Sequence, residues 1–585
     1  MLHFMKKLYS MNMLKRSILA IALSLPSILF AQDSKELAPV SRTYAISNVT
    51  IIQAPGRKID MGTVVLRDGL ILSVGKNVPI PANAIILKAD SMYVYAGFID
   101  GLSRVGVTKP KEEPQSGQQQ QPKDPGNPTP EEAGITPQQD VRNLLNPADK
   151  SIEELRKIGF TTAHVVPYGG MMPGNGAIIQ LSGKSADDMV LVNKSSFYSE
   201  LTPAQRVYPG TVMGVMAKYR ELYRQATLSR SYENVYTVNR SGIQRPTTDR
   251  VLEALYPVVA RRQAVLFKAE KVVDAQRVLT LQSDLGFNLL LAELKEGWDI
   301  VNKVKASYAK VFLSLDLPEE KKDEKKEGEV DAKKDDKAPK KEEKKSDKPK
   351  TPSDIEKETL EKRKADFIAK YVGQAATYHK AGVKFGFSTI NVKVGDIQSN
   401  LRRMITAGLS EDVALASLTT VPAELLGLSD RLGSIDNGKI ANLVISDKPY
   451  FHEKAIVKYV FVDGDLYKVE AKDPKKADVN AKIELSGEWA TITEMPEKKY
   501  AGTLAIRKDG NSFSGTVVGD LIPTAVDLKD VSLEGNSWSF TYVVSVEGQS
   551  ISVTVNVTVD GDEFKGTSTS TEYGSFPISG KRNPK

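Results

Sequence analysis

Apolar runs typical of buried strands alternate with amphipathic stretches over the middle of the chain. The strand-like runs are "FTTAHVV", "AIIQL", "AVLFKA", "FNLLLAEL", "AKVFLSL" and "VKFGFSTI", which begin at residues 160, 177, 264, 287, 309 and 383. Helical patterns lie between several of them, as in "SIEELRKIG", "EKVVDAQRVLTLQSDLG" and "EGWDIVNKVKASY". Continuous apolar strands separated by helices predict a parallel sheet that is buried on both faces.

The length of this region favours a closed barrel. Eight strand-and-helix units need about 250 residues before insertions, so residues 97–430 are predicted to form a (β/α)8 TIM-like barrel. An open doubly wound sheet is the alternative. The glycine-rich stretch "GGMMPGNG" at 169–176 has the spacing of neither nucleotide-binding fingerprint, which speaks against that alternative.

Short strands and tight turns replace this pattern on both sides of the barrel. Residues 42–96 and 431–470 are predicted to pair as one composite β-sandwich, because the two ends of a domain often meet. Residues 483–585 carry about eight short strands with Gly-closed hairpin turns, and they predict a C-terminal all-β barrel or β-sandwich. Trp489 and Trp538 are interpreted as core residues of that unit.

The first 31 residues have the pattern of an export signal. Four basic residues precede the apolar segment Ile18–Phe30, and the small residue Ala31 follows it. This predicts a cleaved Sec-type signal peptide over residues 1–31, with an uncleaved membrane anchor as the alternative. The chain has no cysteine, which excludes a lipoprotein and disulfide bonds. We expect a periplasmic or secreted bacterial protein with no membrane association after cleavage.

Charge and low-complexity segments limit the partners. The formal net charge is +7, and removing the four basic residues of the signal leaves +3, too little to indicate nucleic-acid binding. Residues 319–350 hold 13 lysines against 12 acids and predict a solvated, disordered insertion. Residues 109–139 are rich in Pro, Gln and Gly and predict a second, extended surface loop.

The order of these pieces resembles a known family. The segments "GTVVLRDGLILSVG" before the barrel and "TTVPAELLGLSDRLGSIDNGKIANLVISD" after it make residues 42–470 similar to the amidohydrolase superfamily, particularly to its imidazolonepropionase-like members. The resemblance implies a metal-dependent hydrolase fold. It also implies hydrolysis of carbon–nitrogen bonds, non-peptide or dipeptide-like, with zinc as the cofactor.

The same resemblance implies where metal ligands would stand. The family's motif Asp-x-His-x-His on the first barrel strand falls on Asp100, Leu102 and Arg104, so only the aspartate matches. The eighth strand would end in an aspartate after Ser-Thr, and "FSTIN" has Ile390 at that position. We therefore expect a degenerate member of the family that lacks the metal ligands.

The number of histidines supports this expectation without any alignment. A catalytic zinc needs about three protein ligands, commonly histidines. The chain has four, and His3 lies in the predicted signal. His164 is interpreted as a packed residue inside a strand, His379 as the end of a helix, and His452 as part of a loop outside the barrel. We expect no cofactor.

Polar residues at the predicted strand ends are the candidate site. They are Asp100, Arg104, Lys268, Glu270, Glu293, Asp316, Ser388, Thr389 and Asn391. Carboxylates and a lysine could act as general acid and base if burial shifted their pKa values, or oxygen ligands could hold a hard cation. We favour ion pairs that cap the strand ends, and expect Arg104 to pair with Asp100 or with a neighbouring acid such as Glu270.

Two functions compete at this point. The first is a pseudoenzyme that has lost metal-dependent hydrolysis and binds a ligand or a partner subunit. The partner would be an active amidohydrolase homologue in a hetero-oligomer, or a second copy of the chain. The second is a hydrolase of carbon–nitrogen bonds with an unorthodox site, for which zinc would be the cofactor. The residues at the ligand positions favour the first.

Overall fold

The computed structural model describes residues 43–110, 124–318, 352–469 and 485–583, except for a few turn residues after 495. The predicted signal peptide, residues 111–123 and the charged run 319–350 lie outside the described residues. The chain forms two compact units, which divide at residue 469 and are described separately. Among the described residues, no helix is long and apolar enough to cross a membrane.

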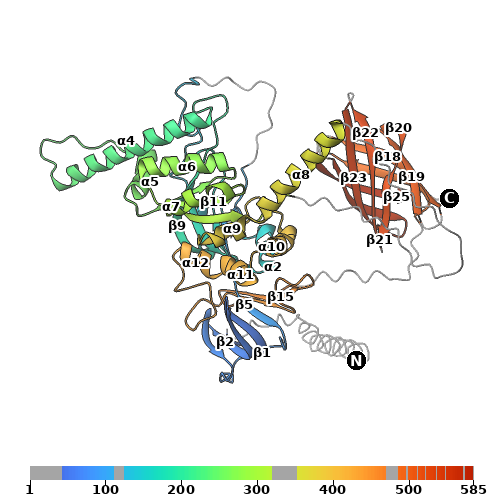
Figure 1. Ribbon diagram of the computed structural model, residues 1–585, viewed down its shortest axis with the longest axis horizontal. Helices are drawn as coiled ribbons and strands as arrows, with labels where there is room; N and C mark the ends of the chain where they lie inside the picture. The colour runs from blue at the N-terminus through green and yellow to red at the C-terminus, as the bar shows by residue number, and fades with distance from the viewer. Residues whose placement is uncertain are drawn as a thin grey trace, which may run out of the picture. The chain divides into compact units, whose positions relative to one another are not determined.

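An eight-stranded sheet forms the centre of the first unit (Figure 1). Its strands, in spatial order, are β6 (Phe98–Ser103), β7 (Phe160–Val165), β8 (Gly174–Gln180), β9 (Val190–Glu200), β10 (Ala264–Lys268), β11 (Leu289–Leu294), β12 (Lys310–Ser314) and β13 (Phe385–Ser388). The first and last strands meet, because the Thr389 N–H donates to the Leu102 carbonyl over 3.2 Å. The predicted TIM-like barrel is confirmed.

One strand departs from the predicted all-parallel arrangement. β8 runs antiparallel to both of its neighbours, β7 and β9, whereas the other adjacent pairs are parallel. The connections explain this difference. β7 and β8 are joined by the loop over residues 166–173, and only the one-turn helix α3 (Ala186–Met189) separates β8 from β9, so no crossover helix can return the chain to the parallel direction.

Helices surround the barrel. They are α2 (Lys150–Lys157), α4 (Val212–Val238), α5 (Arg250–Val259), α6 (Val272–Leu285), α7 (Val301–Ala306), α8 (Pro352–Val372), α9 (Gln374–Lys380), α10 (Ile397–Thr406), α11 (Glu411–Leu418) and α12 (Thr420–Leu425), with short 3-10 turns at Val141–Leu144, Trp298–Ile300 and Val394–Asp396. Local signals set their ends. The Asp149 side chain accepts the Ser151 N–H at the start of α2, and Gly286 ends α6 in the left-handed region with φ 75°.

The predicted surface loop at 109–139 is partly wrong. Within residues 124–139, Ala133 and Ile135 are buried in the barrel core, and Ile135 forms a β-bridge with Met172. These two buried apolar side chains hold the segment against the barrel. The surrounding prolines and glycines had predicted an extended surface loop.

The two flanking segments pair as predicted. They form one sheet of β1 (Thr43–Ala54), β2 (Arg57–Arg67), β3 (Leu70–Gly75), β4 (Ile85–Leu87), β5 (Tyr93–Ala96), β14 (Leu443–Ser446), β15 (Val457–Val462) and β16 (Asp465–Lys468). The pairing of β5 with β14 joins the early and late parts of the chain, with Ala96 opposite Leu443 (Figure 1). This sheet has its own apolar core, which includes Val64, Val94 and Ile445.

The second unit is one antiparallel sheet of nine strands. They are β17 (Gly487–Glu494), β18 (Lys499–Asp509), β19 (Ser512–Gly519), β20 (Ile522–Asp527), β21 (Lys529–Glu534), β22 (Ser537–Val546), β23 (Gln549–Asp560), β24 (Glu563–Ser570) and β25 (Gly574–Arg582). The first strand, β17, pairs with the last, β25, so the meander returns to its start. Trp489 and Trp538 are fully buried, which confirms their interpretation as core residues.

Candidate functional site at the barrel mouth

Asp100 lies in the middle of β6 and is fully buried. One carboxylate oxygen accepts the backbone N–H groups of Leu102, over 3.2 Å, and of Thr389, over 3.1 Å. The other oxygen accepts the Thr389 hydroxyl. Burial raises the pKa of Asp100 to about 7, although the bonds from Thr389 and Leu102 oppose that rise. The group can therefore gain or lose a proton near neutral pH.

Arg104 does not make the predicted ion pair with Asp100 or Glu270. Its guanidinium binds Glu200 at the end of β9, over 2.8 Å, and lies over the ring of Tyr168 at 4.4 Å. The Tyr198 hydroxyl donates to the same Glu200 oxygen over 2.7 Å. The reason is geometric, because Thr389 and the local backbone already hold the Asp100 carboxylate.

Two lysines continue the ion pairs around the mouth. Lys268 lies 3.0 Å from Glu270 and 3.9 Å from Glu200. Lys295 lies 2.7 Å from Asp316 and 3.3 Å from Glu270. Burial opposes the ionisation of Glu270, yet Lys268, Lys295 and Asn391 together hold its pKa below the ordinary value. The arrangement is an ion-pair network that runs from Arg104 to Asp316 across β6, β9, β10, β11 and β12.

Glu293 is the most constrained member of the site. It is fully buried, it interrupts the register between β11 and β12, and its φ of 62° lies in the left-handed region, which is rare for a residue with a side chain. Hydroxyls of Ser314 and Ser388 donate to its carboxylate over 2.7 and 2.6 Å, and the Asn391 amide donates over 3.2 Å. Burial raises the pKa of Glu293.

The residues at the two implied histidine positions and at the implied eighth-strand aspartate do not supply metal donors. Leu102 is buried in an apolar cluster with Val166 and Leu266, and Ile390 packs against the same cluster. The guanidinium of Arg104 carries a positive charge into this region, which repels a cation. Among the described residues, no three His, Cys, Asp or Glu side chains are grouped so that they could hold a metal ion.

The three histidines of the described chain lie on separate elements. His164 is fully buried in β7, and its Nε2 lies 2.9 and 2.8 Å from the hydroxyls of Ser195 and Ser196. Burial lowers the pKa of His164 to about 4, so it is neutral at pH 7. This confirms its interpretation as a packed residue. His379 belongs to α9 and His452 to a turn beyond β14.

The structure brings the candidate residues of the sequence together at one end of the barrel, in one connected group. Thr389 binds Asp100, and its neighbour Ser388 donates to Glu293. The remaining candidates join this group through Glu270, Glu200 or Lys295; they are Arg104, Lys268, Asp316 and Asn391. Sequence reasoning missed Glu200, Tyr198 and Lys295. A signal existed for Lys295, which directly follows the apolar run "LLLAEL". Glu200 ends the stretch "VNKSSFYSE", whose many polar residues do not indicate a buried strand.

An eight-stranded barrel with polar side chains at the carboxyl ends of its strands defines the class of TIM-like barrel proteins that includes many enzymes. Comparison with known proteins agrees. Residues 338–469 match the model of the amidohydrolase family. The crystal structure of an amidohydrolase from Thermotoga maritima has a TM-score of 0.56 at 19% identity, and the match covers 73% of this chain and all of that one. Together these findings show a fold shared with a solved amidohydrolase and a likeness to the amidohydrolase family model over residues 338–469.

Other solved hydrolases are more distant. A prolidase crystallised with N-methylphosphonate-L-proline has a TM-score of 0.40 at 16% identity, covering 73% of this chain and 99% of its own. Molinate hydrolase has a TM-score of 0.39 at 14% identity, covering 73% and 95%. No curated protein sequence matches the chain.

Proposed function

We propose that this protein is a non-catalytic amidohydrolase homologue whose barrel mouth serves as a structural and binding surface. The observation that carries the proposal is the ion-pair network. Arg104 takes the place of a would-be ligand and is neutralised by Glu200. Asp100 is held by Thr389, and the other mouth acids are bound to lysines, serines or an asparagine. Breaking such partly buried pairs leaves charges without partners, so the network stabilises the mouth in one arrangement.

The role that remains is binding. We propose that the mouth receives a ligand or that the barrel associates with an active amidohydrolase homologue, or with a second copy of itself. Export to the periplasm or the outside of a bacterial cell, inferred from residues 1–31, belongs to the same proposal. The finer likeness to imidazolonepropionase-like members also remains a proposal, based on the segments that flank the barrel.

A hydrolase assay tests the loss of activity. The full chain is incubated with a panel of Xaa-Pro dipeptides, N-acyl amino acids and cyclic amides, alone and with added zinc, manganese or cobalt. We expect product formation no faster than in a sample of heat-denatured protein. Turnover that depends on added metal and saturates with substrate would overturn the proposal.

A second candidate function rests on Asp100 and Glu293. Buried carboxyls with raised pKa values are suited to general acid and base catalysis, and the left-handed backbone of Glu293 is the kind of strain that occurs at functional sites. This candidate is hydrolysis of a carbon–nitrogen bond with a carboxyl pair in place of a metal. Metal-independent turnover that is lost in Glu293→Gln, while Glu424→Gln on the exposed side of the barrel retains it, would favour this second function.

A further inference from the structure

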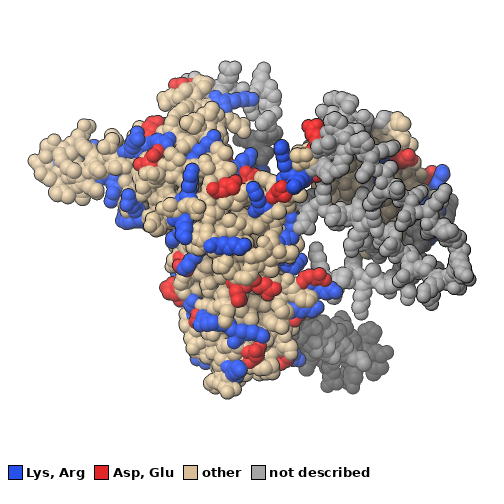
Figure 2. All heavy atoms as spheres, viewed as in Figure 1, with Lys and Arg blue, Asp and Glu red and all other residues tan. Residues whose placement is uncertain are grey.

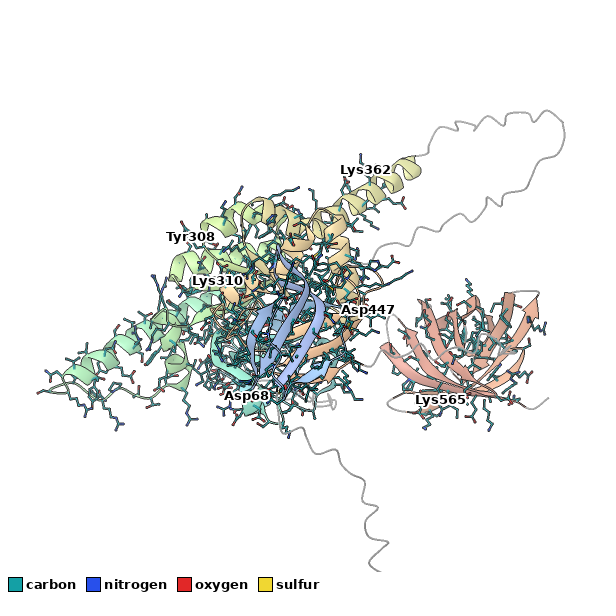
Figure 3. All side chains as sticks on the ribbon, turned by 90° about the horizontal axis from the view of Figure 1, so that it is seen from below. Asp68, Tyr308, Lys310, Lys362, Asp447 and Lys565 are labelled. Atoms are coloured by element: carbon teal, nitrogen blue, oxygen red, sulfur yellow. The ribbon has the colours of Figure 1, made fainter. Side chains whose placement is uncertain are left out.

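The nine-stranded sheet of the C-terminal unit lines a partly open cavity of about 320 Å³. This is within the range of small-ligand pockets, roughly 300–1,000 Å³. Figure 3 shows the sheet curled around inward-facing side chains, with the exposed Lys565 on its outer side. Valine, isoleucine, leucine and phenylalanine dominate the lining, and no Asp, Glu, Lys, Arg or His of the described residues contributes to it.

Aromatic side chains fill the interior at one end of the sheet. The ring centroids of Trp489 and Trp538 are 5.9 Å apart, and the Phe564 ring lies 5.5 Å from each of them. The Trp489 indole donates to the Leu485 carbonyl over 2.9 Å. This end has the dense packing of an ordinary protein core, and none of the three aromatic residues lines the cavity.

Small side chains keep the rest of the interior open. Thr491 on β17, Gly502 on β18 and Gly519 on β19 lie opposite one another in register, and all three line the cavity. Two strands along the sheet from β17, Ser568 and Ser570 of β24 also line the cavity. The next row toward the filled end carries Trp489, paired with Leu504. The sequence thus changes from large to minimal side chains along one face of the same strands.

A core that is complete without a ligand does not require a row of such small side chains. An unfilled apolar cavity destabilises a protein because its lining loses packing contacts, and ordinary cores place large side chains at inward positions. The hollow is therefore suited to an occupant, and the side chains that line it indicate the chemistry of that occupant. Apolar groups surround it, while Thr491, Tyr542 and Ser568 add a few hydroxyls.

We propose that this cavity binds a small uncharged apolar molecule, an aromatic or branched aliphatic compound with one or two hydrogen-bonding groups. The lining carries no charged side chain, so a charged group in the cavity would lose its hydration without gaining an opposite charge. Charged ligands are therefore excluded. This binding site is independent of the function proposed for the barrel, because the cavity lies wholly within residues 491–578.

The test uses two fluorescent probes that share one ring system. N-phenyl-1-naphthylamine is uncharged, and 8-anilinonaphthalene-1-sulfonate is the same molecule with an added sulfonate. Each is titrated into the full chain, and probe emission is recorded. We expect saturable binding of about one neutral probe per chain, with the sulfonate binding at least about tenfold more weakly. Equal affinity for the two probes would overturn the uncharged character of the site.

Matched substitutions locate the binding. Thr493→Phe places a ring in the cavity from β17, whereas Ile492→Phe places it on the outer face of the same strand, where Ile492 is 45% exposed. Ser568→Leu and its neighbour Thr569→Leu form a second pair on β24, with Thr569 exposed. Two pairs on different strands keep the test valid if one variant does not fold, which thermal unfolding would show.

We expect the inward variants to weaken binding of the neutral probe at least about tenfold and the outward variants to bind as the parent does. Absence of saturable binding by the parent would overturn the proposal, even after organic extraction of the protein to remove a copurified occupant. Equal binding by inward and outward variants would also overturn it, since the probe would then bind elsewhere on the chain.

Discussion

Thr389 donates both its backbone N–H and its hydroxyl to the carboxylate of Asp100, and so ties the last strand of the barrel to the first. The same closure point includes the Ser388 hydroxyl, which lies 3.0 Å from the Leu102 carbonyl and 2.6 Å from Glu293. A position at which the sequence resemblance implies a metal ligand is here part of the hydrogen bonding that closes the barrel.

Replacing Asp100 with Asn should change how stability depends on pH. Burial raises the pKa of Asp100 from its ordinary 3.8 to about 7, so the folded chain binds this proton more tightly than the unfolded chain. The stabilisation that the protonated Asp100 carboxyl gives to the folded chain is fully present below pH 4 and is lost as the pH rises to about 7. Asn resembles the protonated form at every pH. We expect urea unfolding to show Asp100→Asn gaining stability relative to the parent between pH 5 and 8, by a few kcal/mol at about 1.4 kcal/mol per unit of pKa.

His164 contributes with the opposite sign. Burial lowers its pKa to about 4, so its contribution is present above its ordinary 6.5 and is lost as the pH falls toward 4. Because His164 is present in both proteins, subtracting the two unfolding free energies at each pH removes its contribution. A difference between parent and Asp100→Asn that stayed constant from pH 5 to 8 would show that Asp100 does not titrate in this range.

The ion pair of Arg104 and Glu200 should be strongly coupled. The two side chains are 22% and 14% exposed, between the surface pairs worth about 1 kcal/mol or less and the buried pairs whose disruption costs roughly 3–5 kcal/mol. We expect Arg104→Ala to lower the free energy of unfolding by about 2 kcal/mol, and a double-mutant cycle with Glu200→Ala to give a coupling of at least about 1 kcal/mol.

An exposed pair on the same unit is the control for that cycle. Lys384 and Glu424 lie 2.6 Å apart but are 62% and 53% exposed, so their coupling should not exceed a few tenths of a kcal/mol. If the Arg104 cycle gave no more coupling than the Lys384 cycle, the mouth would be hydrated in solution and its ion pairs would not hold it in one arrangement.

The sequence predicted the barrel better than it predicted the contacts at the barrel mouth. Apolar runs separated by helices identify most of the strands, but "AIIQL" reads the same in a parallel or an antiparallel strand, so the direction of β8 was not accessible. Strand ends gave Asp100 and Glu293 as candidates. The partner of Arg104 was not predictable, because Glu200 lies 96 residues away in sequence and the two meet only when the barrel closes. On the face that Figure 2 shows, basic and acidic side chains are interspersed.

The purified protein should contain no stoichiometric transition metal. Leu102 and Ile390 offer no donor atom at the positions implied by the family, and Arg104 brings a positive charge beside Asp100's strand. We expect elemental analysis after dialysis against added zinc and then metal-free buffer to give far less than one zinc, manganese or iron per chain. Retention of about one equivalent of any of them would show a metal site made of other residues.

The last prediction concerns a chain that ends at residue 472, without the C-terminal unit. The apolar core of that unit is made only of residues between 485 and 578, whereas the two larger cores of the first unit contain residues up to 469 and none beyond. No core is therefore cut by the truncation. We expect the shortened chain to remain soluble and to unfold cooperatively in urea, at the same midpoint as the first transition of the full chain. A second shortened chain in which a flexible Gly-Ser linker of the same length replaces residues 319–350 should behave alike, because the cost of closing a flexible loop depends on its length and not on its charged side chains. Matched truncation at residue 455 removes β15 and β16 from the composite sheet and should abolish folding. If the chain ending at residue 472 were insoluble or lost cooperative unfolding, the C-terminal unit would have to contribute to the stability of the barrel.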